Sequence, residues 1–182
     1  MGKLKQLLPL GDRPAVLRCL ESIRGAGIDD IVLVVGHDSQ EIMGVIEEFP
    51  AKVVCNAEPE TGMYDSVRLG LGKVDPSASG VFICLADQPL VKADTLLSMR
   101  FCHEEKPDMI IIPLYRGMTG HPPLLPKRIL IEVELFPTLR DLIQRHAEEV
   151  LGVEVADEGV VLDMDTWEDY ERMLECFRQE IH

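Results

Sequence analysis

The chain has 182 residues, of which 46% are hydrophobic, 27% charged and 5% aromatic, a composition typical of one globular domain with a substantial buried core. Its formal net charge of −14 argues against sequence-independent nucleic-acid binding, which depends on neutralising phosphates with lysine and arginine. No apolar run approaches the roughly 18 residues of a membrane-spanning helix, and no signal-like segment follows Met1. We therefore predict a single cytoplasmic domain over residues 1–182, with neither nucleic acid nor membrane as a partner.

The hydrophobic pattern predicts strands that alternate with helices. An amphipathic helix is expected from Pro14 to Ile23, because apolar residues recur there at helical spacing and glycines follow. Apolar runs predict strands at 31–35 and 52–55, with a helix between them that begins near the capping-box residues Asp38–Glu41. Further helices are expected from residue 62 to 71, over 93–103 and around Trp167, and further strands over 81–85, over 109–112 and from Val160.

Apolar strands joined by helices indicate an α/β fold. Strands of this kind are buried on both faces, which predicts a mostly parallel sheet in a three-layer helix–sheet–helix sandwich. In such folds ligands bind at the carboxyl ends of the strands. The residues that follow each expected strand are therefore the candidates for function.

Acidic residues follow two of the expected strands. Asp87 comes after the strand at 81–85, and Asp163 and Asp165 come at the end of the strand expected from Val160. Two carboxylates from separate strand ends, together with a lysine near the N-terminus, suit a Mg²⁺ ion that bridges phosphate oxygens. The alternative is helix or turn capping, by Asp87 at its own turn and by Asp165 or Thr166 at the last helix.

The five cysteines show no spacing typical of a zinc or redox site. Cys84 lies within an apolar run, and no two cysteines are separated by only two residues. We expect reduced and mostly buried thiols with no disulfide framework.

Seven short motifs follow one another along the chain. They are Lys5–Gly11, Gly36–Asp38, Asn56 with Gly62–Met63 and Ser66–Val67, Gly70–Leu71, Asp87–Pro89, Gly120–Pro122 and Leu162–Thr166. Each motif is weak alone, but their order makes the combined signal strong. This order resembles that of the MobA-like NTP transferase family of molybdenum cofactor nucleotidyltransferases. The resemblance is greatest to the CTP:molybdopterin cytidylyltransferase branch, and it extends over nearly the whole chain.

The resemblance implies transfer of a nucleoside monophosphate from a nucleoside triphosphate, CTP in this branch, to the terminal phosphate of molybdopterin, with release of pyrophosphate. It also implies a Rossmann-like sheet of the nucleotide-diphospho-sugar-transferase type. Lys5 would contact the transferring phosphates, and Asp87 and Asp165 would hold Mg²⁺, or Mn²⁺ in its place. A lysine and metal-holding carboxylates suffice for such chemistry, because phosphoryl transfer depends mainly on positioning and charge neutralisation.

The resemblance also implies contacts for the two substrates. The expected nucleotide-binding residues are Lys5, Asn56, Gly62, Met63 and Ser66, and those on the acceptor side are Gln88, Gly120 and His121. His121 fits a structural loop histidine equally well, and His37 is expected to be mainly structural. A recipient molybdoenzyme is a further expected partner. The acidic stretch from Glu148 to His182, with twelve acids and two arginines, is expected to be solvated or to contact a basic patch.

The sequence departs from the family pattern at its start. Family members precede the lysine segment with an apolar strand and a glycine-containing loop whose backbone N–H groups bind the triphosphate. Met1 falls where that loop would end. We therefore expect an N-terminally truncated domain without the first, central strand, and low turnover. The alternatives are a transferase that uses GTP or another acceptor, and a noncatalytic member that binds the cofactor or a partner enzyme.

Overall fold

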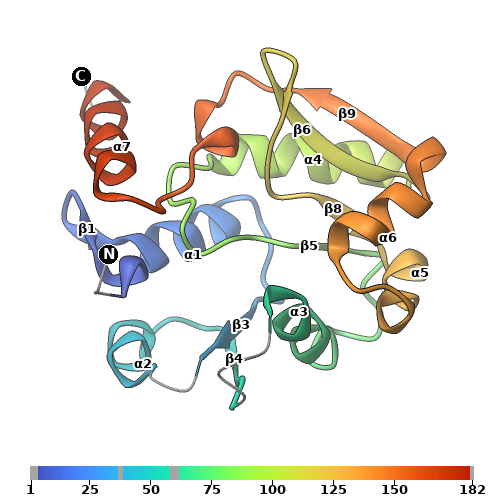
Figure 1. Cartoon of the computed structure of the whole chain (residues 1–182), viewed down its shortest axis with the longest axis horizontal. Coiled ribbons are helices and arrows are strands. Elements are labelled where there is room, and N and C mark those ends of the chain that lie inside the picture. Colours follow the sequence, from blue (N-terminus) through green and yellow to red (C-terminus); the bar gives the residue numbers. More distant parts are fainter. Residues whose placement is uncertain (1–3, 37–38, 58–61, 181–182) are drawn as a thin grey trace.

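The computed structural model describes residues 4–36, 39–57 and 62–180 as an α/β fold (Figure 1). The expected helices at 14–23, 62–71 and 93–103 are confirmed, as is the last helix, and the strand at 52–55 has the bounds that the sequence predicts. The helices are α1 (Ala15–Gly25), α2 (Gln40–Ile46), α3 (Met63–Leu71), α4 (Ala93–Glu105), α5 (Lys127–Leu130), α6 (Leu139–Arg145) and α7 (Trp167–Glu180). The 3-10 helices are η1 (Lys5–Leu7), η2 (Val133–Leu135), η3 (Ala147–Glu149) and η4 (Glu158–Val161).

The strands form three hydrogen-bonded groups. They are β1 (Pro9–Leu10), β2 (Arg13–Pro14), β3 (Val32–Val35), β4 (Lys52–Cys55), β5 (Gly80–Phe82), β6 (Ile110–Tyr115), β7 (Met118–Thr119), β8 (Leu124–Pro126) and β9 (Val150–Glu154). β1 pairs with β2, and β3 pairs with β4 in parallel. The remaining strands make a five-stranded sheet of order β5-β8-β6-β7 with β9 on β6. Within the described residues, β3 pairs only with β4 and β5 pairs only with β8.

The larger sheet is mixed, because one short connection reverses the chain. β6 and β9 are parallel, whereas β8 runs antiparallel to both β5 and β6. Arg116 and Gly117, with φ of 51° and 79°, turn the chain back along β6 as a hairpin. A connection this short permits only antiparallel neighbours. The α/β prediction is confirmed, and the parallel pairs are β3 with β4 and β6 with β9.

The prediction of a strand from Val160 is wrong. Residues Glu158–Val161 form the 3-10 helix η4, and the segment from Leu162 to Thr166 contains no described strand. The physical cause is Asp157, whose side chain accepts a hydrogen bond from the backbone N–H of Gly159 at 3.0 Å. A side chain that bonds its own backbone two residues on makes a turn instead of an extended strand. β5 is also shorter than the expected 81–85, and β9 was not predicted.

Asp157 connects this turn to the start of α4. Its Oδ2 accepts hydrogen bonds from the backbone N–H of Lys92 at 2.9 Å and from the Thr95 hydroxyl at 2.7 Å. Asp157 is only 2% exposed. It lies at the amino-terminal end of α4, where unpaired backbone N–H groups favour an anion. The segment that carries Asp163 and Asp165 is therefore attached to the helix that follows β5.

The core is divided into clusters that lie on either side of the strands. One joins α3, β6, β8, α5 and α6, and a second joins α1, β3 and α2. A third joins the N-terminal segment to α7, and its members are Leu8, Leu10, Ala15, Leu90, Leu162, Met164 and Met173. Figure 1 accordingly shows α7 beside β1, although about 150 residues separate them in the chain. The two ends of the described chain thus share one buried surface.

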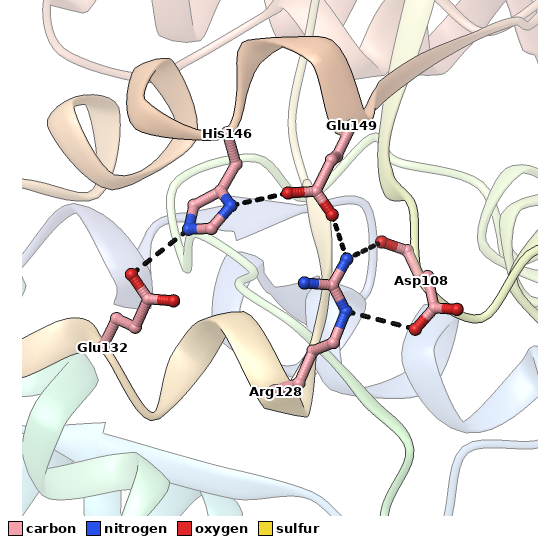
Figure 2. A network of polar contacts seen from close by, with 5 residues as sticks. All are labelled: Asp108, Arg128, Glu132, His146 and Glu149. Carbon is pink, nitrogen blue, oxygen red and sulfur yellow. Dashed lines mark hydrogen bonds and ion pairs between the residues drawn. The ribbon is translucent and has the colours of Figure 1, made fainter.

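Figure 2 shows a polar network at the opposite, amino-terminal ends of β6 and β9. Arg128 on α5 contacts Glu149 and bonds Oδ1 of Asp108 at 3.1 Å. His146 lies between two glutamates: its Nδ1 is 2.7 Å from Oε1 of Glu149, and its Nε2 is 3.3 Å from Oε2 of Glu132. The hydrogen bonds from His146 and Arg128 lower the pKa of the Glu149 carboxyl. This network connects α5 to the starts of two strands, on the side away from their carboxyl ends.

Two of the five cysteines depart from the expectation of buried thiols. All five are free, as predicted, but Cys55 and Cys84 are exposed.

Among the described residues, no helix is long and apolar enough to cross a bilayer.

The Asp157 contacts give a first test of this architecture. Replacing Asp157 with Ala removes the acceptor of two buried donors, Thr95 and Gly159, and of the partly buried N–H of Lys92, and we expect the free energy of unfolding to fall by about 2–4 kcal/mol. Chemical denaturation measures the change. Asp94→Ala is the matched control, because Asp94 lies exposed in the first turn of the same helix and should cost little. Equal stability of Asp157→Ala and Asp94→Ala would contradict the proposed attachment.

Candidate active site

A lysine from the N-terminal segment lies between two aspartates that are distant in sequence. Lys5 Nζ is 2.6 Å from Oδ2 of Asp87 and 2.6 Å from Oδ1 of Asp165. The two carboxylate oxygens are therefore separated by no more than the sum of these distances. Lys5 belongs to η1, Asp87 to the turn after β5 and Asp165 to the segment before α7. The expected convergence of these three residues is present.

Buried leucines position Lys5. The turn of η1 is closed by a backbone hydrogen bond from Leu8 N to the Lys5 carbonyl oxygen at 3.1 Å. Leu8 and Leu10 then pack against α7, and the Tyr170 hydroxyl donates to the Pro9 carbonyl oxygen at 2.6 Å. These contacts hold the N-terminal segment against α7 and the residues that flank Asp165, which places Lys5 near that carboxylate.

Asp165 is held by its two neighbours in sequence. Met164 is 1% exposed and anchors the segment in the core. Thr166 caps α7, since its hydroxyl accepts from Asp169 N at 3.1 Å while Asp169 Oδ2 accepts from Thr166 N at 2.8 Å. This reciprocal pair is a capping box. Thr166, one of the two expected alternatives, therefore caps the helix, and the Asp165 carboxylate bonds Lys5 instead.

The Asp87 carboxylate has an unused oxygen. Its Oδ2 bonds Lys5, while its Oδ1 is buried and accepts no hydrogen bond from any described residue. A buried carboxylate oxygen without a donor is costly unless a cation or donor reaches it. The following backbone N–H, of Gln88, bonds the Leu85 carbonyl instead. The expected capping alternative for Asp87 therefore finds no support among these contacts.

The charges at this site are unevenly shielded from solvent. Partial burial lowers the pKa of Lys5, but the hydrogen bonds from its ammonium to Asp165 and Asp87 outweigh that effect and raise the pKa overall. Lys5 is thus cationic at neutral pH. The Asp165 side chain is 65% exposed and that of Asp87 is 19% exposed. A ligand can therefore approach from the Asp165 side.

The two aspartates fit a hard divalent cation. Carboxylate oxygens are the preferred ligands of Mg²⁺, which commonly takes one or two carboxylates and completes its shell with water and phosphate oxygens. Among the described residues, no group of three or more acidic, histidine or cysteine side chains is placed to hold a metal. Two carboxylates leave the rest of a Mg²⁺ coordination shell to water or phosphate oxygens.

Another set of predicted residues lies where β4 meets α3. The Asn56 side chain is 7% exposed and its Nδ2 donates to the Ser66 hydroxyl at 3.3 Å. Asn56 N also donates to the Val35 carbonyl oxygen at 2.7 Å, at the carboxyl ends of β3 and β4. Gly62 is the N-cap of α3, and Met63, its first residue, is 55% exposed. These four residues lie in one region, at the carboxyl end of β4 and the start of α3.

The residues expected on the acceptor side are differently placed. His121 lies close enough to Asp87 and Asp163 for both to act on it electrostatically; burial lowers its pKa, and the two carboxylates oppose this. Gln88 is 6% exposed and lines a small cavity with Cys19 and Cys84. His37 and Asp38 lie outside the described residues.

Gly120 has a steric role that explains its position. A Cβ at residue 120 would lie 2.5 Å from the Val160 carbonyl oxygen. The same carbonyl accepts a hydrogen bond from His121 N at 2.8 Å. Close approach of these two backbones is possible only with glycine. The sequence reasoning missed this packing and the Asp157 contacts, although an Asp two residues before a glycine is a recognisable turn signal.

The steric requirement at Gly120 can be tested directly. Gly120→Ala should lower the free energy of unfolding by about 1–3 kcal/mol, because the added methyl group overlaps backbone. Gly44→Ala is the matched control: a Cβ there meets nothing within 4 Å, and helix α2 should gain about 0.5–1 kcal/mol. Thermal unfolding of both variants measures the difference. If Gly120→Ala were as stable as Gly44→Ala, the close packing described here would be wrong.

Residues 1–156 match the family model of the MobA-like NTP transferase domain. The chain belongs to this family. Among curated proteins, the bifunctional protein GlmU of Aquifex aeolicus is 30% identical over 102 residues, a match that covers 56% of this chain and 22% of that protein. The GlmU of Parvibaculum lavamentivorans is 30% identical over 112 residues, with 24% of its length covered. The chain thus spans about a quarter or less of these relatives.

Solved structures resemble the whole domain. Rv0371c from Mycobacterium tuberculosis H37Rv is 29% identical with a TM-score of 0.81, covering 96% of this chain and 90% of that one. A structure of Rv0371c in complex with manganese has a TM-score of 0.77 at 27% identity, covering 96% and 93%. A nucleotidyl transferase from Methanothermobacter, at 19% identity and a TM-score of 0.83 over 97% and 86%, supports the fold alone. The nucleotidyltransferase fold expected from the sequence is confirmed.

Proposed function

We propose that this chain is a nucleotidyltransferase that moves a nucleoside monophosphate from a nucleoside triphosphate to the terminal phosphate of an acceptor. An acceptor phosphate oxygen forms a bond to the α-phosphorus, the bond from that phosphorus to the oxygen bridging to the β-phosphate breaks, and pyrophosphate leaves. The observation that carries the proposal is the convergence of Lys5, Asp87 and Asp165 in a member of the MobA-like NTP transferase family.

Charge explains why these three side chains suit the reaction. Asp87 and Asp165 would hold Mg²⁺ or Mn²⁺, which when bound neutralises charge on phosphate oxygens. Lys5 supplies a further positive charge to the same phosphates. Positioned cations account for most of the catalysis in phosphoryl transfer, so the chain needs no covalent nucleophile. The manganese complex of Rv0371c, at 27% identity, supports a divalent ion in a protein of this fold.

The remaining predicted residues would bind the two substrates. Asn56, Ser66 and the Gly62–Met63 backbone would position the base and ribose from the β4–α3 region. Gln88, Gly120 and His121 would serve the acceptor side. Of these, His121 is the one with an electrostatic connection to Asp87. Gly120 would act through its backbone, because its lack of a Cβ lets the segment at Val160 approach.

CTP is the proposed donor and a molybdopterin-type molecule the proposed acceptor, with a recipient molybdoenzyme as a further partner. Both substrate assignments rest on the order of the sequence motifs. The assay should therefore compare CTP with GTP, each with Mg²⁺ and with Mn²⁺, and follow pyrophosphate release and label transfer to molybdopterin. Faster transfer from GTP would replace the proposed donor while leaving the reaction class in place.

Asp87→Asn is the variant that tests the site. The amide keeps the shape of the side chain but loses its charge, and we expect kcat to fall on the order of 10²–10³-fold with little change in folding. Asp29→Asn is the control, since Asp29 is 83% exposed and only 4.0 Å from Arg24 at the surface. Full activity of Asp87→Asn, or a folded protein that transfers neither nucleotide, would exclude the proposed function at this site.

A further inference from the structure

Lys5 occupies the place that a cation shared by Asp87 and Asp165 would take. Its Nζ is 2.6 Å from one oxygen of each carboxylate. A Mg²⁺ ion bound by both would lie about 2.1 Å from an oxygen of each. An ammonium group and a metal ion in that space would overlap and repel each other. A divalent ion bound by the same two oxygens, Asp87 Oδ2 and Asp165 Oδ1, would therefore displace the Lys5 ammonium.

We propose that Lys5 is the resident counter-cation of the Asp87–Asp165 pair, and that a divalent metal binds there only as Lys5 moves onto a triphosphate. The proposal rests on the proposed function and concerns the order of events at the same site. Without a triphosphate, departure of Lys5 gives up two charge-assisted hydrogen bonds and offers its ammonium no new anion. With a triphosphate, the ammonium exchanges carboxylate oxygens for phosphate oxygens.

The surroundings of Lys5 permit this exchange without opening the core. The Lys5 side chain is 26% exposed and Asp165 is 65% exposed. A lysine has a flexible four-carbon stem, so its ammonium can move several ångströms while η1 stays in place. The Leu8 and Leu10 contacts with α7 hold the backbone of this segment independently of the ion pairs.

The unused oxygen of Asp87 favours the exchange. Lys5 bonds Oδ2 and leaves the buried Oδ1 without a donor among the described residues. A divalent ion carries twice the charge and can bind either oxygen, or both. Metal and triphosphate should therefore strengthen each other's binding, because each removes an obstacle to the other. By linkage this coupling is the same in both directions.

A different role for Lys5 would give a different result. If Lys5 acted only on phosphates, its removal would leave metal binding in the absence of nucleotide unchanged. If it is the counter-cation, its removal frees the carboxylate pair. The affinity for metal alone thus separates the two roles.

The experiment measures Mn²⁺ binding to nucleotide-free protein by electron paramagnetic resonance of the unbound ion. We expect Lys5→Met to bind Mn²⁺ at least about tenfold more tightly than the unaltered chain, because a competing full charge is gone. Lys5→Arg keeps the charge and should stay near the unaltered affinity. Lys52→Met is the control for net charge, since Lys52 pairs with Asp30, 2.5 Å away, on a different part of the surface.

Thermal unfolding gives a second readout that also tests folding of the variant. Lys5→Met leaves two carboxylates facing each other, so its Tm should fall and Mn²⁺ should raise it by more than it raises that of the unaltered chain. Trp167, the single tryptophan of the chain, lies two residues after Asp165 and reports local binding by fluorescence. Asp165→Asn in the Lys5→Met background should remove the gained Mn²⁺ affinity.

The outcomes distinguish this inference from the proposed function. If Lys5→Met binds Mn²⁺ no more tightly than the unaltered chain, and the unaltered chain transfers nucleotide, the counter-cation role alone is overturned. If Lys5→Met binds Mn²⁺ more tightly through Asp165 but the unaltered chain shows no transferase activity, the counter-cation role is supported and the proposed function is overturned. Absence of Mn²⁺ binding in every variant, Lys5→Met included, would overturn the counter-cation role, and the transfer assay would decide the proposed function separately.

Discussion

The ion pairs of Lys5 with Asp87 and Asp165 join three parts of the chain that are 82 and 160 residues apart in sequence. Two carboxylates at this separation repel each other, and partial burial increases the cost of keeping both ionised. A cation between them is therefore a condition for the observed arrangement of η1, the turn after β5 and the segment before α7. That cation is Lys5 in this structure, and the position is one that a metal ion could also take.

The rest of the fold supports this arrangement from outside the site. Leu8, Leu10 and Met173 bury the contact between the N-terminal segment and α7. Asp157 ties η4 to α4, and Gly120 lets the backbone at residue 160 pack closely. Each of these contacts limits where Asp165 can lie relative to Asp87. The polar network around Arg128 lies at the other ends of β6 and β9 and has no part in the site (Figure 2).

Sequence reasoning predicted most helices correctly and named the three side chains that meet at the candidate site, but it failed where tertiary contacts decide the backbone. The helix at α1 and the strand at β4 follow from local periodicity. Asp87 and Asp165 are singled out by their place after expected strands, and the roles of these residues and of Lys5 are implied by family resemblance. The segment from Val160 has the apolar pattern of a strand, yet the Asp157 side chain bonds Gly159 N and bends the chain into η4. The direction of β8 relative to β6 depends on the turn at Arg116–Gly117. The spacing of hydrophobic residues contains no information on that direction.

The counter-cation role of Lys5 means that Asp87 and Asp165 share one cation position, which Lys5 fills until a metal and a triphosphate replace it. A crystal structure with Mn²⁺ and a non-hydrolysable CTP analogue, with anomalous scattering recorded for manganese, tests this most directly. We expect an anomalous peak at bonding distance from both carboxylates, with the Lys5 ammonium on the phosphates. A manganese peak elsewhere, or Lys5 still between the two aspartates with nucleotide and metal bound, would contradict it.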